Sequence, residues 1–158
     1  FSSTVTTEVS VNQLEAFENI VPIDLTSIFT GYSLLPAVTG TKKQTGAWDG
    51  AGQTRTVLLA DGSSVQEMLT KYDLPNYFSY NVSHFTGILR LLTIEADGEW
   101  WFSSTPSGET HIEWRYAFKA KSFLTAPLLW FISNMLWRGY MQKALQLLKA
   151  QLLEKNIR

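Results

Sequence analysis

The chain has 158 residues, with 13 basic and 14 acidic side chains and a formal net charge of −1. This length is typical of one domain with a sizeable core, so we expect residues 1–158 to form a single domain, and the near-neutral charge argues against a nucleic-acid partner. The sequence contains no cysteine and two histidines, which excludes a disulfide framework, thiolate-bound zinc and a histidine-rich metal site, and we expect neither a metal nor another cofactor.

The first predicted elements are a strand and a short helix. Valine alternates with polar residues over residues 4–11, which is the period of a strand with one buried face. Asn12 and Glu15 have the spacing of a capping box, which predicts a helix that continues to about Asn19. Its apolar side is expected to bury Leu14, Phe17 and Ile20.

A sheet is predicted for the middle of the chain. A second short helix is expected to start at Asp24 or Thr26 and to end near Tyr32. From Ala37 to Lys121, turn signals rich in Gly, Pro, Asn and Asp divide the chain into six further runs with strand character. Each connection is short enough for a hairpin, so we predict seven antiparallel strands in all. Trp114 lies on the aromatic face of the last strand, which is expected to point inward.

The hairpin around Ala60-Asp61-Gly62 decides whether a pair of charges faces inward. If the turn is a three-residue loop with its glycine in the left-handed conformation, Arg55 lies opposite Glu67. A two-residue turn would place Arg55 opposite Met68 and Glu67 on the other face. We favour the three-residue loop. The inward pair would either orient a ligand carboxylate, phenol or carbonyl, or serve as a structural pair satisfied by water.

The last segment, from Thr125 to Ile157, is predicted to form one long apolar helix. A continuous helix over residues 126–156 would be about 46 Å long, more than simple packing requires, so we expect part of it to line a cavity. Its most apolar run, residues 123–137, is shorter than the ~20 residues of a membrane span, so we expect no transmembrane segment. Gly139 costs about 1 kcal/mol relative to alanine, which indicates close approach by a neighbour or a bound molecule.

Spacing the residues at 100° around this helix predicts two apolar faces. The face assigned to the sheet carries Trp130, Trp137, Met141, Ala144, Leu145, Leu148 and Leu152. The face that points away from the sheet carries Leu128, Leu129, Ile132, Met135 and Leu136. We expect this second face to be covered by another segment of the chain, by a homodimer contact or by a membrane surface.

Several short motifs accompany this order of elements. They are Gly52-x-x-Arg55-x-Val57, the Asp61-Gly62 turn, Val65-x-Glu67-x-Leu69 and Gly108-x-Thr110-x-Ile112-x-Trp114. Over essentially its whole length the chain resembles the START-like helix-grip superfamily, also called SRPBCC, and within it the polyketide cyclase/dehydrase-like branch. The resemblance implies an α+β helix-grip fold, in which a seven-stranded antiparallel sheet curls around the long C-terminal helix and two short helices lie between strands 1 and 2. It also implies that seven side chains face a ligand cavity, namely Arg55, Val57, Leu59, Glu67, Leu69, Phe78 and Tyr80.

The candidate ligand-binding residues are these seven side chains together with Trp114, Asn134, Trp137 and Met141. The candidates for catalysis are Arg55, Tyr80 and His84. His84 would be an inward group able to exchange protons near neutral pH. No second catalytic group lies at a fixed spacing from His84, so a hydrogen-bonded structural histidine is favoured there.

The expected function is the binding of a hydrophobic small molecule, such as a lipid, a polyketide or an aromatic compound, in a cavity between the sheet and the terminal helix. One alternative is an aromatase-type polyketide cyclase/dehydratase, for which the resemblance is the only support. Another is a lipid or quinone carrier at a membrane surface. Because the sequence begins at Phe1 and not at a methionine, we expect a segment to precede it, where any targeting signal would lie. The compartment is therefore left open, with a slight preference for the cytoplasm.

Overall fold

Seven strands form the main layer of the computed structural model, which describes residues 1–157 and the side chains of residues 1–155. The strands are β1 (Ser2–Val9), β2 (Val38–Lys42), β3 (Thr54–Leu59), β4 (Ser64–Asp73), β5 (Tyr77–Ser83), β6 (Thr93–Ser104) and β7 (Thr110–Ala120). They form one sheet in the order β1-β7-β6-β5-β4-β3-β2, and every neighbouring pair is antiparallel. The predicted sheet is therefore confirmed.

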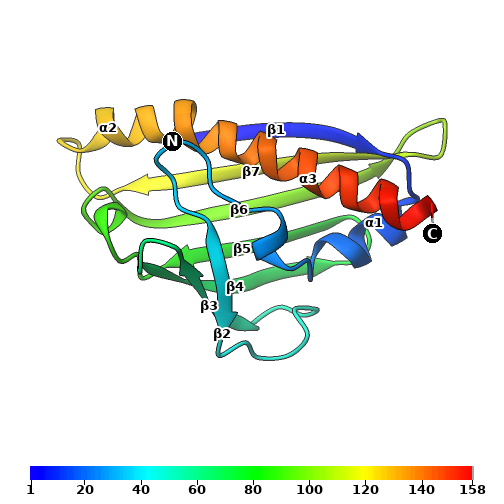
Figure 1. The fold of residues 1–158 in the computed structure, drawn as a ribbon, viewed down its shortest axis with the longest axis horizontal. Helices are drawn as coiled ribbons and strands as arrows, with labels where there is room; N and C mark the ends of the chain where they lie inside the picture. Colours follow the sequence, from blue (N-terminus) through cyan, green and yellow to red (C-terminus); the bar gives the residue numbers. More distant parts are fainter. Residues whose placement is uncertain (158) are drawn as a thin grey trace.

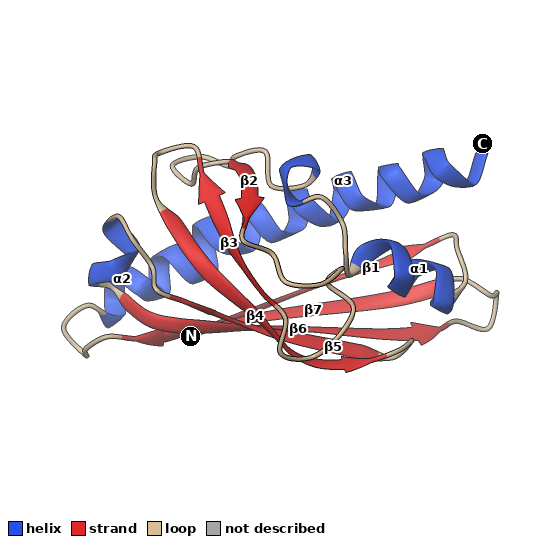
Figure 2. Cartoon of the chain, turned by 90° about the horizontal axis from the view of Figure 1, so that it is seen from below, coloured by secondary structure: helices blue, strands red, loops and turns tan. Residues whose placement is uncertain are grey.

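The helical elements form the second layer. They are α1 (Gln13–Ile20), two short 3₁₀ helices η1 (Leu25–Ser27) and η2 (Ile88–Leu91), α2 (Ala126–Phe131), the π-helix η3 (Ile132–Trp137) and α3 (Arg138–Ile157). The last three follow one another without a break, so one helix extends to the carboxy-terminal end of the described chain. Figure 1 shows this helix running along β1 and β7, and Figure 2 shows β2 and β3 rising from the other strands toward it. This is the predicted helix-grip arrangement.

Helix α1 starts where the sequence predicted. The Asn12 side chain accepts a hydrogen bond from the backbone N–H of Glu15 at 2.9 Å, which caps the helix. The prediction that Leu14 is buried is wrong, because its side chain is 47% exposed. Gln13 takes the inner position instead, where its Nε2 donates to the carbonyl oxygens of Pro75 and Phe102.

The second short helix is only the single turn η1. Asp24 is its N-cap, since the Asp24 carboxylate accepts from the backbone N–H of Thr26 at 3.0 Å. The helix does not continue to Tyr32, because Gly31 adopts a φ of +101°, a conformation that a right-handed helix cannot contain. Residues 28–37, which we call the strap, instead cross from η1 to β2.

The π-helix changes which residues of the terminal helix face the sheet. Met141, Ala144, Leu145, Leu148 and Leu152 are buried as predicted. Trp130, predicted on the same face, is 53% exposed, whereas Leu129, predicted on the outer face, is fully buried, and Ile132 also points inward. A π-helix turns less per residue than an α-helix, so a 100° wheel that fits α3 assigns the wrong faces to the residues before it. Leu128 and Met135 do face outward, and Leu136 is half-buried.

An aromatic cluster fills the space beneath α1. The Phe17 ring packs edge-to-face on Phe78 and on Phe102, with centroid separations of 5.9 and 5.1 Å. Trp100 and Trp114 stack next to them at 4.6 Å. Such pairs add specific stabilisation to the burial of their area. This end of the sheet is therefore closed, and the space under the strap is where the interior stays open.

Candidate ligand-binding cavity

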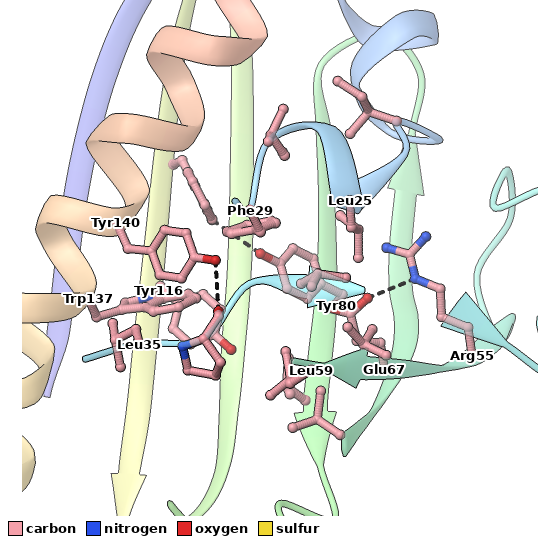
Figure 3. Close-up of a pocket in the computed structure, with 18 of the residues that line it drawn as sticks. Leu25, Phe29, Leu35, Arg55, Leu59, Glu67, Tyr80, Tyr116, Trp137 and Tyr140 are labelled. Carbon is pink, nitrogen blue, oxygen red and sulfur yellow. Dashed lines mark hydrogen bonds and ion pairs between the residues drawn. The ribbon is translucent and has the colours of Figure 1, made fainter. Parts of the chain in front are cut away.

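An apolar cavity with a volume of about 130 Å³ lies between the sheet, the strap and the terminal helix. Residues from every strand except β1 line it, together with η3, the first turn of α3 and the segment from Ile20 to Val38. Figure 3 shows this lining, with the strap residues Phe29 and Leu35 facing Tyr80 and Leu59 of the sheet. The cavity thus occupies the place predicted for it, between the sheet and the helix.

Most of the predicted wall does line the cavity. The residues of the predicted set that contribute to the lining are Arg55, Val57, Leu59, Glu67, Phe78, Tyr80, Trp114 and Trp137. This agreement concerns position alone; their contact with a ligand stays a prediction.

Three predicted wall residues do not line the cavity. Leu69 is fully buried in the hydrophobic core, and its backbone pairs with that of Gly52 and Gln53. Met141 follows the lining residue Tyr140 directly but is fully buried in the part of α3 that packs on the sheet. Asn134 belongs to the π-helix and donates from its side-chain amide to the carbonyl oxygen of Trp130, within the helix itself.

An ion pair forms the most polar part of the wall. The Arg55 Nε atom donates to the Glu67 carboxylate at 2.8 Å, and the two side chains are 7% and 12% exposed. They lie directly opposite each other on β3 and β4, as the three-residue loop predicted, and Gly62 has a φ of +86°. Trp48 packs under the guanidinium, with the Arg55 Cζ atom 4.0 Å from the ring centroid, a cation–π contact.

The pair leaves part of the Arg55 guanidinium unused. Glu67 occupies only the Nε donor, and no described residue accepts a hydrogen bond from either Nη atom. A guanidinium offers five N–H donors in a planar fork, so Arg55 retains donors for a further acceptor.

Tyr80 is a second polar group in the wall. Its hydroxyl oxygen accepts a hydrogen bond from the indole nitrogen of Trp114 at 3.2 Å. Burial, and after it the negative charge of Glu67, raises the pKa of Tyr80, so the phenol stays protonated and can donate to an acceptor. Gly98 lies opposite Tyr80 on β6, and a Cβ atom there would collide with the Tyr80 ring. The strand glycine thus makes room for this tyrosine.

Two further polar groups lie where the helix meets the cavity. Burial raises the pKa of Tyr116 well above its ordinary value. The Tyr116 ring packs on Trp137 with a centroid separation of 4.8 Å. The Trp137 indole nitrogen is buried and, within the described part of the chain, has no hydrogen-bond partner. Ser133 lies outside the cavity, because its carbonyl accepts from the Ser3 hydroxyl at 2.6 Å.

The strap covers one side of the cavity and is fastened to α3. The Tyr140 hydroxyl donates to the carbonyl of Pro36 at 2.9 Å (Figure 3). It also accepts a hydrogen bond from the backbone N–H of Gly31 at 2.9 Å. The Lys143 ammonium donates to the carbonyl of Gly31 at 2.7 Å. The Tyr32 ring fills the space that a side chain at Gly139 would need. The neighbour predicted from this helix glycine is therefore the strap.

The sequence missed these covering residues, because the strap has no periodic pattern and its contacts join positions about 110 residues apart in the chain. Gly139 was the one signal that something approaches the helix.

His84 is not in the cavity. The prediction placed it inward by alternation along β5, but the strand ends at Ser83, and His84 is exposed with a φ of +53°. Its Nδ1 atom lies 3.0 Å from the Ser83 hydroxyl, and Phe85 takes the inward position instead. The inward position predicted for His84 is therefore wrong, and its contact with Ser83 agrees with the hydrogen-bonded histidine that the sequence favoured. The other histidine, His111, lies 3.7 Å from Glu8, and both of these side chains are partly exposed to solvent.

Among the described residues, no group of three or more His, Cys, Asp or Glu side chains is arranged to hold a metal ion. None of the helices in this part of the chain is both long enough and apolar enough to cross a bilayer.

Comparison with protein families supplies the identification. A family described as polyketide cyclase / dehydrase and lipid transport matches residues 21–153. The chain belongs to this family. The match covers the strap, the sheet from β2 to β7 and most of the terminal helix, and it confirms the resemblance seen in the sequence. A search of curated protein sequences finds no significant match.

Solved structures show the same fold. A norcoclaurine synthase point mutant from Thalictrum flavum, in complex with a transition-state analogue, has a TM-score of 0.72 at 12% identity, over 99% of this chain and 96% of that one. Major latex-like protein 151 from Panax ginseng has 0.69 at 10% identity, with 96% of each chain covered. A protein from Nitrosospira multiformis has 0.68 at 13% identity over the full length of both chains. At these identities the likeness extends to the fold alone.

Proposed function

We propose that the chain binds a small aromatic molecule in the cavity between the sheet, the strap and the terminal helix. The observation that carries this proposal is an apolar space of about 130 Å³ inside the protein. Interiors rarely leave voids larger than a water molecule, and an empty void costs roughly 24 cal/mol per Å³, here up to about 3 kcal/mol. Because an empty cavity would destabilise the protein by this amount, its presence supports a role in binding a small molecule.

The size of the cavity limits the guest. Apolar cavities of about 150 Å³ bind benzene, whereas pockets for drug-sized ligands measure roughly 300–1,000 Å³. A compound of one aromatic ring with short substituents fits the cavity at its present volume. A whole lipid or an extended polyketide would require the strap to leave α3, so we do not propose a carrier of whole lipids.

The ion pair limits the charge of the guest. Arg55 and Glu67 neutralise each other, so an ionised guest would leave one charge uncompensated in a buried site. A neutral phenol or aromatic ketone instead meets donors that it can use, from the free side of the Arg55 guanidinium and from the Tyr80 hydroxyl. We therefore propose a neutral aromatic guest with one hydrogen-bonding oxygen.

Calorimetric titration with toluene, p-cresol and benzoate tests the proposal. We expect p-cresol to bind more tightly than toluene because it gains a hydrogen bond, and benzoate to bind weakest because it brings an unpaired charge. Native mass spectrometry of the purified protein would show whether a small molecule is already retained.

A matched pair of variants locates the binding. Val57→Phe fills the cavity from the wall, so it should abolish binding of p-cresol and raise the melting temperature of the empty protein. Leu58→Phe changes the next residue of β3, which does not line the cavity, and should leave binding unchanged. The proposal fails if no probe binds the wild type, or if both variants bind p-cresol as the wild type does.

One observation favours a second candidate, a cyclase/dehydratase activity. Arg55 and Tyr80 both line the cavity, and each can donate a hydrogen bond to a carbonyl oxygen, which would polarise it. His84 lies outside the cavity, so the mechanism proposed here does not include it. The test is turnover of an aromatic polyketide precursor by the wild type and by Tyr80→Phe. Turnover equal in both proteins would exclude Tyr80 from the reaction, and no turnover by either would leave binding alone.

A further inference from the structure

Large apolar side chains are exposed together at the end of the molecule where η2 meets the connection from β7 to α2. We call this set the apolar tip: Ile88, Leu91, Ile94, Phe123, Leu124 and Leu128. Their exposed fractions range from 51% for Leu128 to 84% for Phe123. The two segments lie side by side, because Lys121 donates from its backbone N–H to the carbonyl of Leu92 and from its Nζ to the carbonyl of Arg90. In Figure 1 they are the green and yellow loops beside α2.

The charges around the apolar tip are mostly positive. Residues 84–94 and 119–131 contain no Asp or Glu, but they carry Arg90, Lys119 and Lys121, all exposed. Two carboxylates lie nearby: that of Glu95, which lies opposite Lys119 in the sheet, and that of Asp61 in the β3–β4 turn. This turn adjoins η2, because the carbonyl of Ser64 accepts a hydrogen bond from the backbone N–H of Thr86. Because the chain as a whole has a net charge of −1, this positive excess is local.

We propose that the apolar tip docks on the surface of an anionic lipid bilayer. Exposed patches of large apolar residues mark interaction sites, and aromatic and aliphatic side chains flanked by Lys and Arg are the pattern of surfaces that enter the headgroup region. The apolar residues insert between the lipids while the cations remain at the level of the anionic headgroups.

The shape of the apolar tip favours a bilayer over a second protein. Its most exposed residues, Phe123 and Leu124, stand on a short loop and Ile88 on a single helical turn, so they project separately instead of forming a flat face. The cores of protein interfaces are depleted in charged residues and closely packed, whereas three cations border this set. The outer helix face predicted from the sequence contributes Leu128 to the apolar tip but not Leu129 or Ile132, which turn inward.

The apolar tip adjoins the cavity. Leu89 of η2, Phe118 of β7 and Ile132 of η3 line it, and they belong to the elements that carry or adjoin the exposed residues. Docking there would bring the cavity close to apolar compounds dissolved in the bilayer. The docking itself goes beyond the proposed function and does not depend on it, because vesicle binding is measured without any guest.

Vesicle flotation tests the proposal, using phosphatidylcholine vesicles with and without phosphatidylserine. The wild type should float with the mixed vesicles and bind the neutral ones less. Phe123→Glu with Leu124→Glu should abolish flotation, because two apolar anchors become acidic. Arg90→Gln with Lys121→Gln should weaken binding to the mixed vesicles roughly twentyfold to thirtyfold, at about a factor of five for each cation, and leave binding to the neutral vesicles nearly unchanged.

The matched control changes two exposed leucines near the opposite end of the terminal helix, Leu14→Glu with Leu153→Glu. This variant has the same change in charge and should float like the wild type. The proposal is overturned if the wild type floats with neither vesicle, or if the control loses binding as fully as the tip variant. The proposal is also overturned if the wild type does not float but forms a concentration-dependent dimer in analytical ultracentrifugation that the tip variant does not form. The apolar tip would then be a contact between two copies of the chain.

Discussion

Removing the arginine of the buried ion pair should destabilise the protein far more than removing an arginine from a surface pair. In Arg55→Gln, the Glu67 carboxylate stays 12% exposed but loses the donor at 2.8 Å that compensates its charge. Breaking one partner of a buried pair typically costs about 3–5 kcal/mol, which for a chain of this size lowers the melting temperature by roughly 6–20 °C. The lost contact with Trp48 adds to this cost.

The matched control is Arg115→Gln. Arg115 lies 3.6 Å from Glu99, but the two side chains are 48% and 29% exposed, so water screens their attraction. Such pairs contribute about 0–1 kcal/mol, and we expect the control to change the free energy of unfolding by no more than that.

Urea denaturation of both variants at neutral pH gives the two free energies. A third variant, Arg55→Met with Glu67→Met, removes both charges together and should recover most of the stability lost in Arg55→Gln, because no buried charge is left unpaired. Equal losses of less than 1 kcal/mol for Arg55→Gln and Arg115→Gln would refute the reasoning, since they would mean that the Arg55 pair is as well solvated as the surface one.

Three further outcomes are expected. Tyr140→Phe removes both hydrogen bonds that fasten the strap to α3, and should cost about 1–3 kcal/mol in urea denaturation and accelerate hydrogen exchange at the Gly31 amide; unchanged exchange would contradict the fastening. Gly139→Ala gains about 1 kcal/mol of helix propensity but must displace the Tyr32 ring, so we expect no net stabilisation and faster hydrogen exchange in the strap. A full gain of about 1 kcal/mol with unchanged hydrogen exchange would show that no side chain packs on Gly139. The folded state raises the pKa of Tyr80 above its ordinary 10.0, so above about pH 10 the unfolded chain releases this proton while the folded chain keeps it, and the contribution of Tyr80 to stability is lost. The free energy of unfolding should therefore fall as the pH rises above about 10, and it should fall less steeply in Tyr80→Phe. Equal slopes in the two proteins would show that the Tyr80 hydroxyl is solvated.

The sheet could be predicted from local sequence patterns, whereas most of its inner wall was predicted from the family resemblance. Alternation along β7 placed Trp114 inward, and one turn type fixed the register that joins Arg55 to Glu67. Side chains alternate along a strand, so each residue can be assigned to one of only two faces of the sheet once the register is known.

Predictions made by extending a period past the end of its element were wrong. Alternation along β5, extended by one residue, assigns His84 to the inner face, but the strand ends at Ser83. Leu129 and Trp130 were assigned with an angle valid for α3, and the π-helix between them and α3 changed that angle. The sequence showed neither break, because a π-helix and a strand end are decided by packing and hydrogen bonds from distant segments.

The fastening of the strap has a kinetic consequence. For the proposed guest, leaving beneath the strap requires breaking the contacts of Tyr140 and Lys143 with the strap backbone. How long a molecule remains inside would then depend on residues of the helix, whereas how tightly it is held depends on Arg55, Tyr80 and the apolar wall. Dwell time and affinity could thus change independently, through substitutions on opposite sides of the same space.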